Sequence, residues 1–128
     1  MEKLIIEGSK DKPSVKLDKE SGTLYIGGAS LPENVLEVYR PVNEWLDEYI
    51  KDPNPDTTID FYFEYLNTAS SRMIVRLLEK CLEMKSLCNS LVINWYYTSG
   101  DIDMSDFGHE LIELTDYPIN IITRNHHP

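Results

Sequence analysis

Cysteine is scarce in this sequence. Only Cys81 and Cys88 occur, seven residues apart, with no CxxC pair and no histidine at a matching spacing. This pattern indicates neither a structural zinc site nor a redox motif. Cys81 also falls on the apolar stripe of a predicted helix, so we expect it to pack in a core and both thiols to be reduced.

Long apolar runs are absent as well. The run Leu4 to Ile6 meets a charge after three residues, which is too short for a signal peptide, and no later run is long enough to cross a bilayer. We therefore expect a cytoplasmic protein that does not insert into a membrane.

Basic residues are few compared with acidic ones. The chain has 12 lysines and arginines against 22 aspartates and glutamates, a formal net charge of −10. A chain with this balance repels a phosphate backbone and releases no counterions from it. Nucleic acid and anionic membranes are therefore poor candidate partners.

The six glycines of the chain form no glycine-rich phosphate-binding loop. Gly27-Gly28 follows a predicted strand, but it lacks the lysine and the spacing of a P-loop or a dinucleotide fingerprint. A turn is sufficient to explain this pair. The sequence therefore predicts no nucleotide cofactor at this position, and no other motif in it implies a cofactor.

No constellation of catalytic residues is evident either. His109 lies on the polar side of a predicted helix, His126 and His127 lie among the last three residues, and no nucleophile elbow is present. Asp60 and Glu64 share a strand face about 13 Å apart, which is too wide for a glycosidase pair. The sequence therefore favours a protein that is not an enzyme.

The length and composition predict one ordinary globular domain over residues 1–128. Apolar residues make up 41% and charged residues 27% of the chain, which is close to the average for a folded domain. Periodicity predicts a strand at 4–6, a hairpin at 14–17 and 23–26, strands at 58–65, 90–97 and 118–123, and a helix before each of these last three.

The first helix is predicted to begin at Ser30. Ser30-Leu31-Pro32-Glu33 has the form of a capping box with an early proline, and apolar residues then follow at helical spacing to Ile50. Pro41 lies inside this pattern, so we expect a kink or a break there.

Alternating strands and helices predict parallel strands joined by right-handed crossovers. Most strands alternate polar and apolar residues, which favours helices mainly on one face of the sheet. The strand at 58–65 is expected to place Ile59, Phe61, Phe63 and Tyr65 inward. The other face would display residues that include Asp60, Tyr62, Glu64, Asn94 and Tyr96. The predicted fold class is α/β, a mixed sheet with an N-terminal hairpin and helices mainly on one face.

The segment Leu66 to Ser71 joins a strand to a helix, which is where α/β folds collect ligands and switches. Free N–H groups and the positive dipole end of the helix would stabilise a phosphoryl group on Thr68 or Ser70. Arg72 and Arg76 follow Thr68 at spacings of four and eight residues, where they could pair with a phosphate. Local chemistry alone, however, favours Asn67 or Thr68 as an ordinary N-cap.

Two other segments have alternative interpretations. Asp101, Asp103 and Asp106 suggest a calcium loop, but the glycine and the terminal glutamate are not at EF-hand positions. An acidic first helical turn or an acidic docking surface explains these three residues as well. Trp95-Tyr96-Tyr97 could stack on a base, although a half-buried strand is the favoured interpretation.

The segment from Phe61 to Ser71, FYFEYLNTASS, followed by Trp95-Tyr96-Tyr97 and an acidic stretch, resembles the SiaC family of bacterial regulatory phosphoproteins over nearly the whole chain. The order of elements is also similar to the STAS fold of anti-sigma-factor antagonists. In this sequence the acidic stretch is interrupted by Ser99-Gly100.

The resemblance implies a protein without catalytic activity that a partner kinase phosphorylates on Thr68 and a partner phosphatase dephosphorylates. Asn67, Ser70, Ser71, Arg72 and Arg76 would surround the phosphate or contact a partner. The resemblance further implies that the unphosphorylated form binds a diguanylate cyclase and links the switch to cyclic-di-GMP signalling and biofilm formation. An anti-sigma-factor antagonist and a small-anion sensor are the alternatives.

Overall fold

Six strands form one mixed sheet in the order of the chain, β1 to β6. The computed structural model describes residues 1–126, so the prediction for His127 lies outside the described residues. The strands are β1 (Leu4–Ile6), β2 (Ser14–Asp18), β3 (Thr23–Ser30), β4 (Asp56–Leu66), β5 (Ser90–Thr98) and β6 (Asn120–Arg124). β1, β2 and β3 pair antiparallel, whereas β3 to β6 pair parallel.

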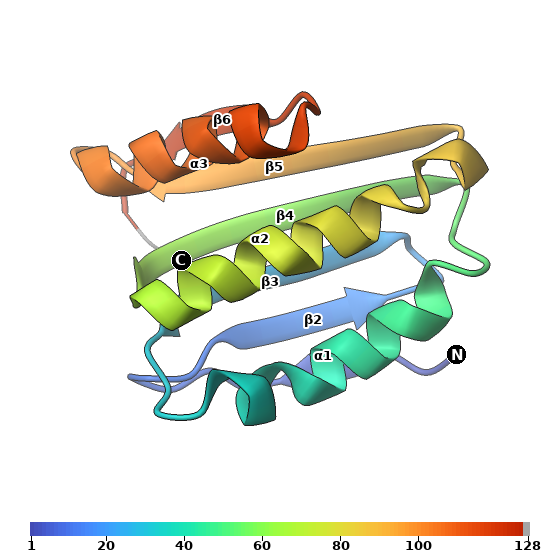
Figure 1. Ribbon diagram of the computed structural model, residues 1–128, viewed down its shortest axis with the longest axis horizontal. Helices are drawn as coiled ribbons and strands as arrows, with labels where there is room; N and C mark the ends of the chain where they lie inside the picture. Colours follow the sequence, from blue (N-terminus) through green and yellow to red (C-terminus); the bar gives the residue numbers. More distant parts are fainter. Residues whose placement is uncertain (127–128) are drawn as a thin grey trace.

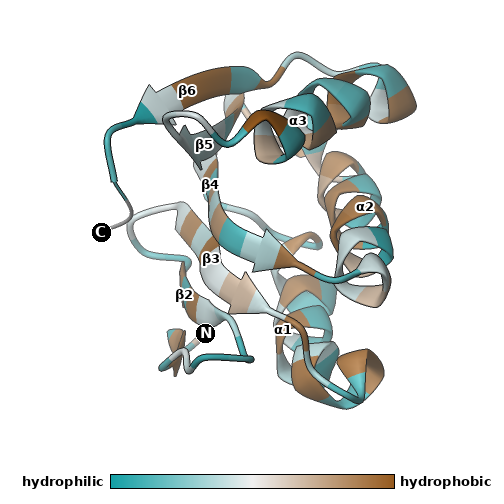
Figure 2. Cartoon of the chain, turned by 90° about the vertical axis from the view of Figure 1, so that its left-hand side faces the viewer, coloured by the Kyte–Doolittle hydropathy of each residue, from teal (hydrophilic) through white to brown (hydrophobic). Residues whose placement is uncertain are grey.

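Three α-helices connect the parallel strands: α1 (Val35–Tyr49), α2 (Thr68–Leu82) and α3 (Ile102–Thr115), with a short 3-10 turn at Lys85–Leu87. Each crossover steps to the next strand in the same direction across the sheet (Figure 1). Right-handed crossovers that all step the same way put every helix on the same face. Figure 2 shows the three helices on one side of the sheet, as the sequence predicted.

The core lies between the sheet and these helices. Phe61, Phe63 and Trp95 are fully buried and contact one another, with ring centroids 5.5–6.2 Å apart. Cys81 belongs to the same buried core and lies on the apolar stripe of α2, as predicted, and burial raises the pKa of its thiol to about 12. In the described part of the chain, no helix is long and apolar enough to span a membrane.

The predicted start of α1 at Ser30 is wrong. The helix begins at Val35, and its N-cap is Asn34, whose side chain accepts a hydrogen bond from the Glu37 N–H. Ser30 instead ends β3, because parallel pairing with β4 continues to its partner Leu66. The helix also continues through Pro41 without a break. Pro41 is exposed, so water can satisfy the carbonyl that its ring leaves without an N–H donor.

Three side chains differ from their predicted environment. Tyr65 was expected inward but is 53% exposed. The helical spacing of Met104, Phe107, Leu111 and Leu114 predicts the third helix with these residues on its apolar stripe, yet Leu114 is 54% exposed. Tyr62 was expected on the open face but is only 5% exposed. It keeps the outward direction, but its hydroxyl donates a hydrogen bond to the His126 carbonyl, so His126 lies against it.

Candidate functional site

The junction between β4 and α2 is fixed at both ends by hydrogen bonds. Asn67 is the N-cap of α2, and its side chain accepts a hydrogen bond from the Ser70 N–H at 2.9 Å. Its own N–H donates to the Ser30 carbonyl at 3.0 Å, which ties the junction to the end of β3. Asn67 therefore has the capping role that local chemistry favoured, and Thr68 is the first residue of the helix.

A β-bulge precedes this junction. Gly28 pairs with Phe63 and Ala29 pairs with Tyr65, so Glu64 is an extra residue in β4. An extra residue reverses the alternation of side chains along a strand, which is why Tyr65 is exposed and Leu66 packs against the core. The bulge thus sets the direction in which the chain enters α2.

The side chains that follow the cap point in different directions. Thr68 and Ala69 are exposed, whereas Ser70 is completely buried. The Ser70 hydroxyl lies 2.8 Å from the Ser30 hydroxyl, which lies 2.8 Å from the Tyr39 hydroxyl. Burial raises the pKa of Tyr39 to about 12, so its hydroxyl stays protonated within this chain of hydrogen bonds. Ser70 therefore joins β3, α1 and α2, and its hydroxyl is not on the surface that a phosphate or a partner would contact.

Removing the Ser70 hydroxyl should destabilise the protein. A buried group that loses its hydrogen-bond partner costs about 1–3 kcal/mol, so we expect Ser70→Ala to lower the free energy of unfolding by about that amount in urea denaturation. Ser71→Ala is the matched control, because Ser71 is half-buried and its side chain forms no hydrogen bond among the described residues. Equal effects of the two substitutions would contradict this role of Ser70.

Thr68 lies at the edge of a groove of about 420 Å³ between α2 and α3. From α2, Ser71, Arg72 and Val75 line the same groove as Thr68. The α3 wall consists of Phe107, Glu110 and the exposed Leu114. The groove therefore combines apolar side chains with one basic and one acidic residue next to an exposed threonine hydroxyl.

The two predicted arginines differ in position. Arg72 and Arg76 are both exposed on α2, and among residues 1–126 neither forms an ion pair. Only Arg72 lines the groove with Thr68. The structure thus brings Thr68, Ser71 and Arg72 together, uses Asn67 as the cap, buries Ser70 and places Arg76 a further turn along the helix.

The acidic segment before α3 serves as a helix start. Asp101 is the N-cap of α3, and its carboxylate accepts a hydrogen bond from the Met104 N–H. Within the described part of the chain, no three histidine, cysteine or carboxylate side chains are grouped so that they could hold a metal ion. His109 is exposed, and its Nδ1 lies 2.9 Å from the Ser105 carbonyl oxygen.

The α3 wall of the groove was not identified from the sequence as part of the site. The helix was predicted from its apolar stripe, but the stripe does not tell which apolar residue rests on the sheet and which faces the neighbouring helix. The exposed position of Leu114 follows from where α3 lies relative to α2, which is a long-range property of the fold.

Comparisons with known proteins agree on one family. The sequence model of the SiaC family regulatory phosphoproteins matches residues 6–124. A protein of Pseudomonas aeruginosa with no characterised function is 26% identical over 121 residues, covering 94% of this chain and 96% of that protein.

Solved structures give the same result. The chain is similar to one in the crystal structure of the diguanylate cyclase SiaD in complex with its activator SiaC from Pseudomonas aeruginosa, with a TM-score of 0.85 and 25% identity, covering 94% of this chain and 99% of that one. A separate structure of SiaC from the same organism has a TM-score of 0.80 at 25% identity, covering 98% and 100% of the two chains.

Proposed function

This chain belongs to the SiaC family of regulatory phosphoproteins, and from that premise we propose that it is a non-catalytic protein that binds and controls a diguanylate cyclase. Phosphorylation of Thr68 switches this binding. The similar SiaC chain of Pseudomonas aeruginosa is the activator of the cyclase SiaD. The observation that carries the proposal is the position of Thr68, exposed at the first residue of α2 and on the edge of a groove.

The start of α2 suits a phosphoryl group. The first N–H groups of a helix have no acceptor within it, and the dipole of the helix favours negative charge at this end. Arg72 lies one turn further along and has no carboxylate partner among the described residues, so its guanidinium is available to a phosphate on Thr68. The phosphorylated form therefore keeps the fold and changes only its surface.

The groove explains how such a change would control binding. The unmodified site offers a neutral hydroxyl beside Val75, Phe107 and Leu114, which suits a partly apolar partner surface. Phosphorylation adds about −1.5 to −2 charges next to Glu110, in a protein whose net charge is already −10. A partner that covers the groove must then desolvate this charge, so the modified form binds more weakly.

The regulatory cycle requires other proteins. A kinase adds the phosphate to Thr68 and a phosphatase removes it, both acting in the cytoplasm, and the cyclase connects the switch to cyclic-di-GMP signalling and biofilm formation. The exposed hydroxyl of Thr68 is accessible to both enzymes without local unfolding, whereas the buried hydroxyl of Ser70 is not.

Mass spectrometry of the protein isolated from its own cells tests the modification. We expect one phosphorylated peptide with the phosphate on Thr68, no phosphate in the Thr68→Ala variant, and an unchanged level in Ser71→Ala. A phosphate on Ser70 or Ser71 in the parent protein, or its persistence in Thr68→Ala, would refute the assignment.

A further inference from the structure

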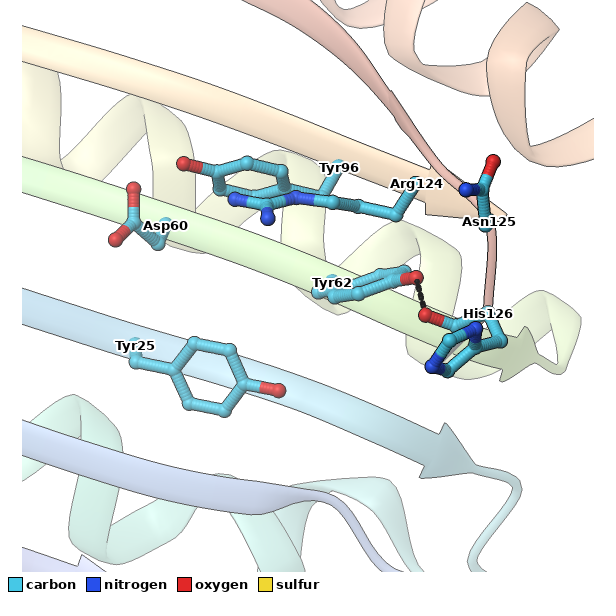
Figure 3. Close-up of a pocket in the computed structure, with 7 residues that line it drawn as sticks. All are labelled: Tyr25, Asp60, Tyr62, Tyr96, Arg124, Asn125 and His126. Atoms are coloured by element: carbon cyan, nitrogen blue, oxygen red, sulfur yellow. Dashed lines mark hydrogen bonds between the residues drawn. The ribbon is translucent and has the colours of Figure 1, made fainter. Parts of the chain in front are cut away.

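The face of the sheet that has no helices contains a pocket of about 530 Å³ (Figure 3). Its floor is formed by side chains of β3, β4 and β5, and the end of β6 and the residues after it form its rim. The lining residues include Tyr25, Asp60, Tyr62, Tyr96, Arg124 and His126. Small-molecule sites commonly have volumes of about 300–1,000 Å³, so this pocket has the size of a ligand site.

Three tyrosines form an aromatic shelf on this floor. A Cβ atom on Gly27 would lie only 2.3 Å from the Tyr25 hydroxyl, so the absence of a side chain at Gly27 allows the Tyr25 ring to lie along the sheet. Gly27, Tyr62 and Tyr96 are paired across β3, β4 and β5, and the ring centroids of the two tyrosines are 5.9 Å apart with the ring planes tilted by 41°. This arrangement presents aromatic surface to the pocket (Figure 3).

A fixed carboxylate lies beside the shelf. Asn120 donates a hydrogen bond to Asn94, and Asn94 donates to Asp60 Oδ1 at 2.8 Å, so the two amides orient the carboxylate. Within residues 1–126, Asp60 Oδ2 accepts no hydrogen bond and Asp60 forms no ion pair. Asp60 therefore retains an acceptor that a ligand with N–H donors would use.

A fixed guanidinium completes the pocket. Arg124 lies over the ring of Tyr96, with Cζ 4.6 Å from the ring centroid, and Figure 3 shows it on the side of the shelf nearest Asp60. Its N–H groups point outward in the plane of the guanidinium. A ligand that reached the edge of this guanidinium could accept the paired hydrogen bonds that an arginine fork donates.

We propose that this pocket binds guanine as the base of a nucleoside or nucleotide. Guanine carries two adjacent donors, N1–H and N2–H, which match a carboxylate, and next to them two acceptors, O6 and N7, which match the fork of an arginine. Asp60 and Arg124 supply this pair of partners side by side (Figure 3), and Tyr25 and Tyr62 supply aromatic surface for stacking, since Arg124 already covers the Tyr96 ring. The proposal concerns the sheet face opposite Thr68 and does not depend on the function proposed above.

Two other ligand classes fit less well. An organic cation would suit the tyrosines and Asp60, but the Arg124 guanidinium at the same edge would repel it. Adenine presents an acceptor, N1, beside its amino group, so only one of its two groups would be compatible with the Asp60 carboxylate.

Titration calorimetry with GMP, AMP, XMP and free arginine tests the proposal on the full chain. The parent protein should bind GMP at least about tenfold more tightly than AMP, the discrimination expected from one bidentate pair. XMP has a carbonyl where GMP has the N2 amino group. Asp60→Asn offers an amide donor to that carbonyl, so this variant should prefer XMP to GMP, a reversal that mere structural damage cannot produce.

Matched variants separate this site from the Thr68 switch. Thr68→Ala should bind GMP as the parent does, whereas Arg124→Gln and Tyr25→Leu should each weaken GMP binding by about tenfold. No GMP binding by the parent, equal affinity for GMP and AMP, preferential binding of arginine, or an Asp60→Asn variant with unchanged preference would each overturn the proposal. None of these results would affect the role proposed for Thr68.

Discussion

Thr68→Asp should bind the proposed cyclase partner about thirty-fold more weakly than the parent, or worse. A negative charge here has to be desolvated when a partner covers the groove, and charges left imperfectly paired in an interface cost about 2–5 kcal/mol even with Arg72 nearby. About 1.4 kcal/mol corresponds to a factor of ten in affinity. Thr68 lies on the edge of the α2–α3 groove beside Glu110, so an aspartate there adds negative charge where an acidic side chain already lies. The measurement is a calorimetric titration of each variant with the cyclase of the same organism.

The matched control is Thr68→Asn, which has the size of aspartate without its charge. Asparagine is also compatible with a helix start, so the two variants should be equally stable within about 0.5 kcal/mol. If charge is the switch, Thr68→Asn should bind within a few-fold of the parent. Equal weakening by asparagine and aspartate would show that shape, and not charge, controls binding at this site.

Trp95→Ala should lower the free energy of unfolding by about 3–5 kcal/mol, the usual cost of removing a buried tryptophan. Trp95 is fully buried, packs against Phe61, Phe63 and Phe107, and donates a hydrogen bond from Nε1 to the Met104 carbonyl at 2.9 Å. Domains of ordinary size have only about 5–15 kcal/mol of stability. Urea denaturation should therefore show a large fall in the midpoint.

The same residue positions α3 on the sheet. A Cβ atom on Gly108 would lie 2.5 Å from Trp95 Cδ1, so the helix rests directly on the indole ring. Trp95→Phe keeps an aromatic ring but loses the donor to Met104, and it should lie between the parent and Trp95→Ala in stability. A Trp95→Ala variant as stable as Trp95→Phe would contradict this account of how α3 is held.

Much of the fold could be predicted because its signals are local. The alternation in β4 and β5 and the apolar stripe of α2 each depend on residues close in sequence, and that alternation already indicated helices mainly on one face of the sheet. The predicted start of α1 failed for the opposite reason. Ser30 has the sequence context of a cap, but its hydroxyl contacts Tyr39 and Ser70, and Ser70 lies on another helix.

The Thr68 site was predicted only in part, because only some of its signals are local in the sequence. Asn67 and Thr68 could be placed at a helix start because the change of period is visible in the sequence. The exposure of Tyr65 could not be predicted, because the bulge depends on the register between β3 and β4. Likewise the meeting of Tyr25 with Arg124 in one pocket requires the positions of four strands.

The strand order of the sheet also separates local from distant pairings. Because β1 to β6 are neighbours in space in the same order as in the chain, each pairing joins strands that are consecutive in sequence. β2 and β3 are joined by a short hairpin, whereas each parallel pair from β3 to β6 has to close a crossover that contains a helix, and such non-local pairings form more slowly. The Thr68 junction is tied to β3, which precedes it in the chain, but the groove beside it requires α3, which follows it.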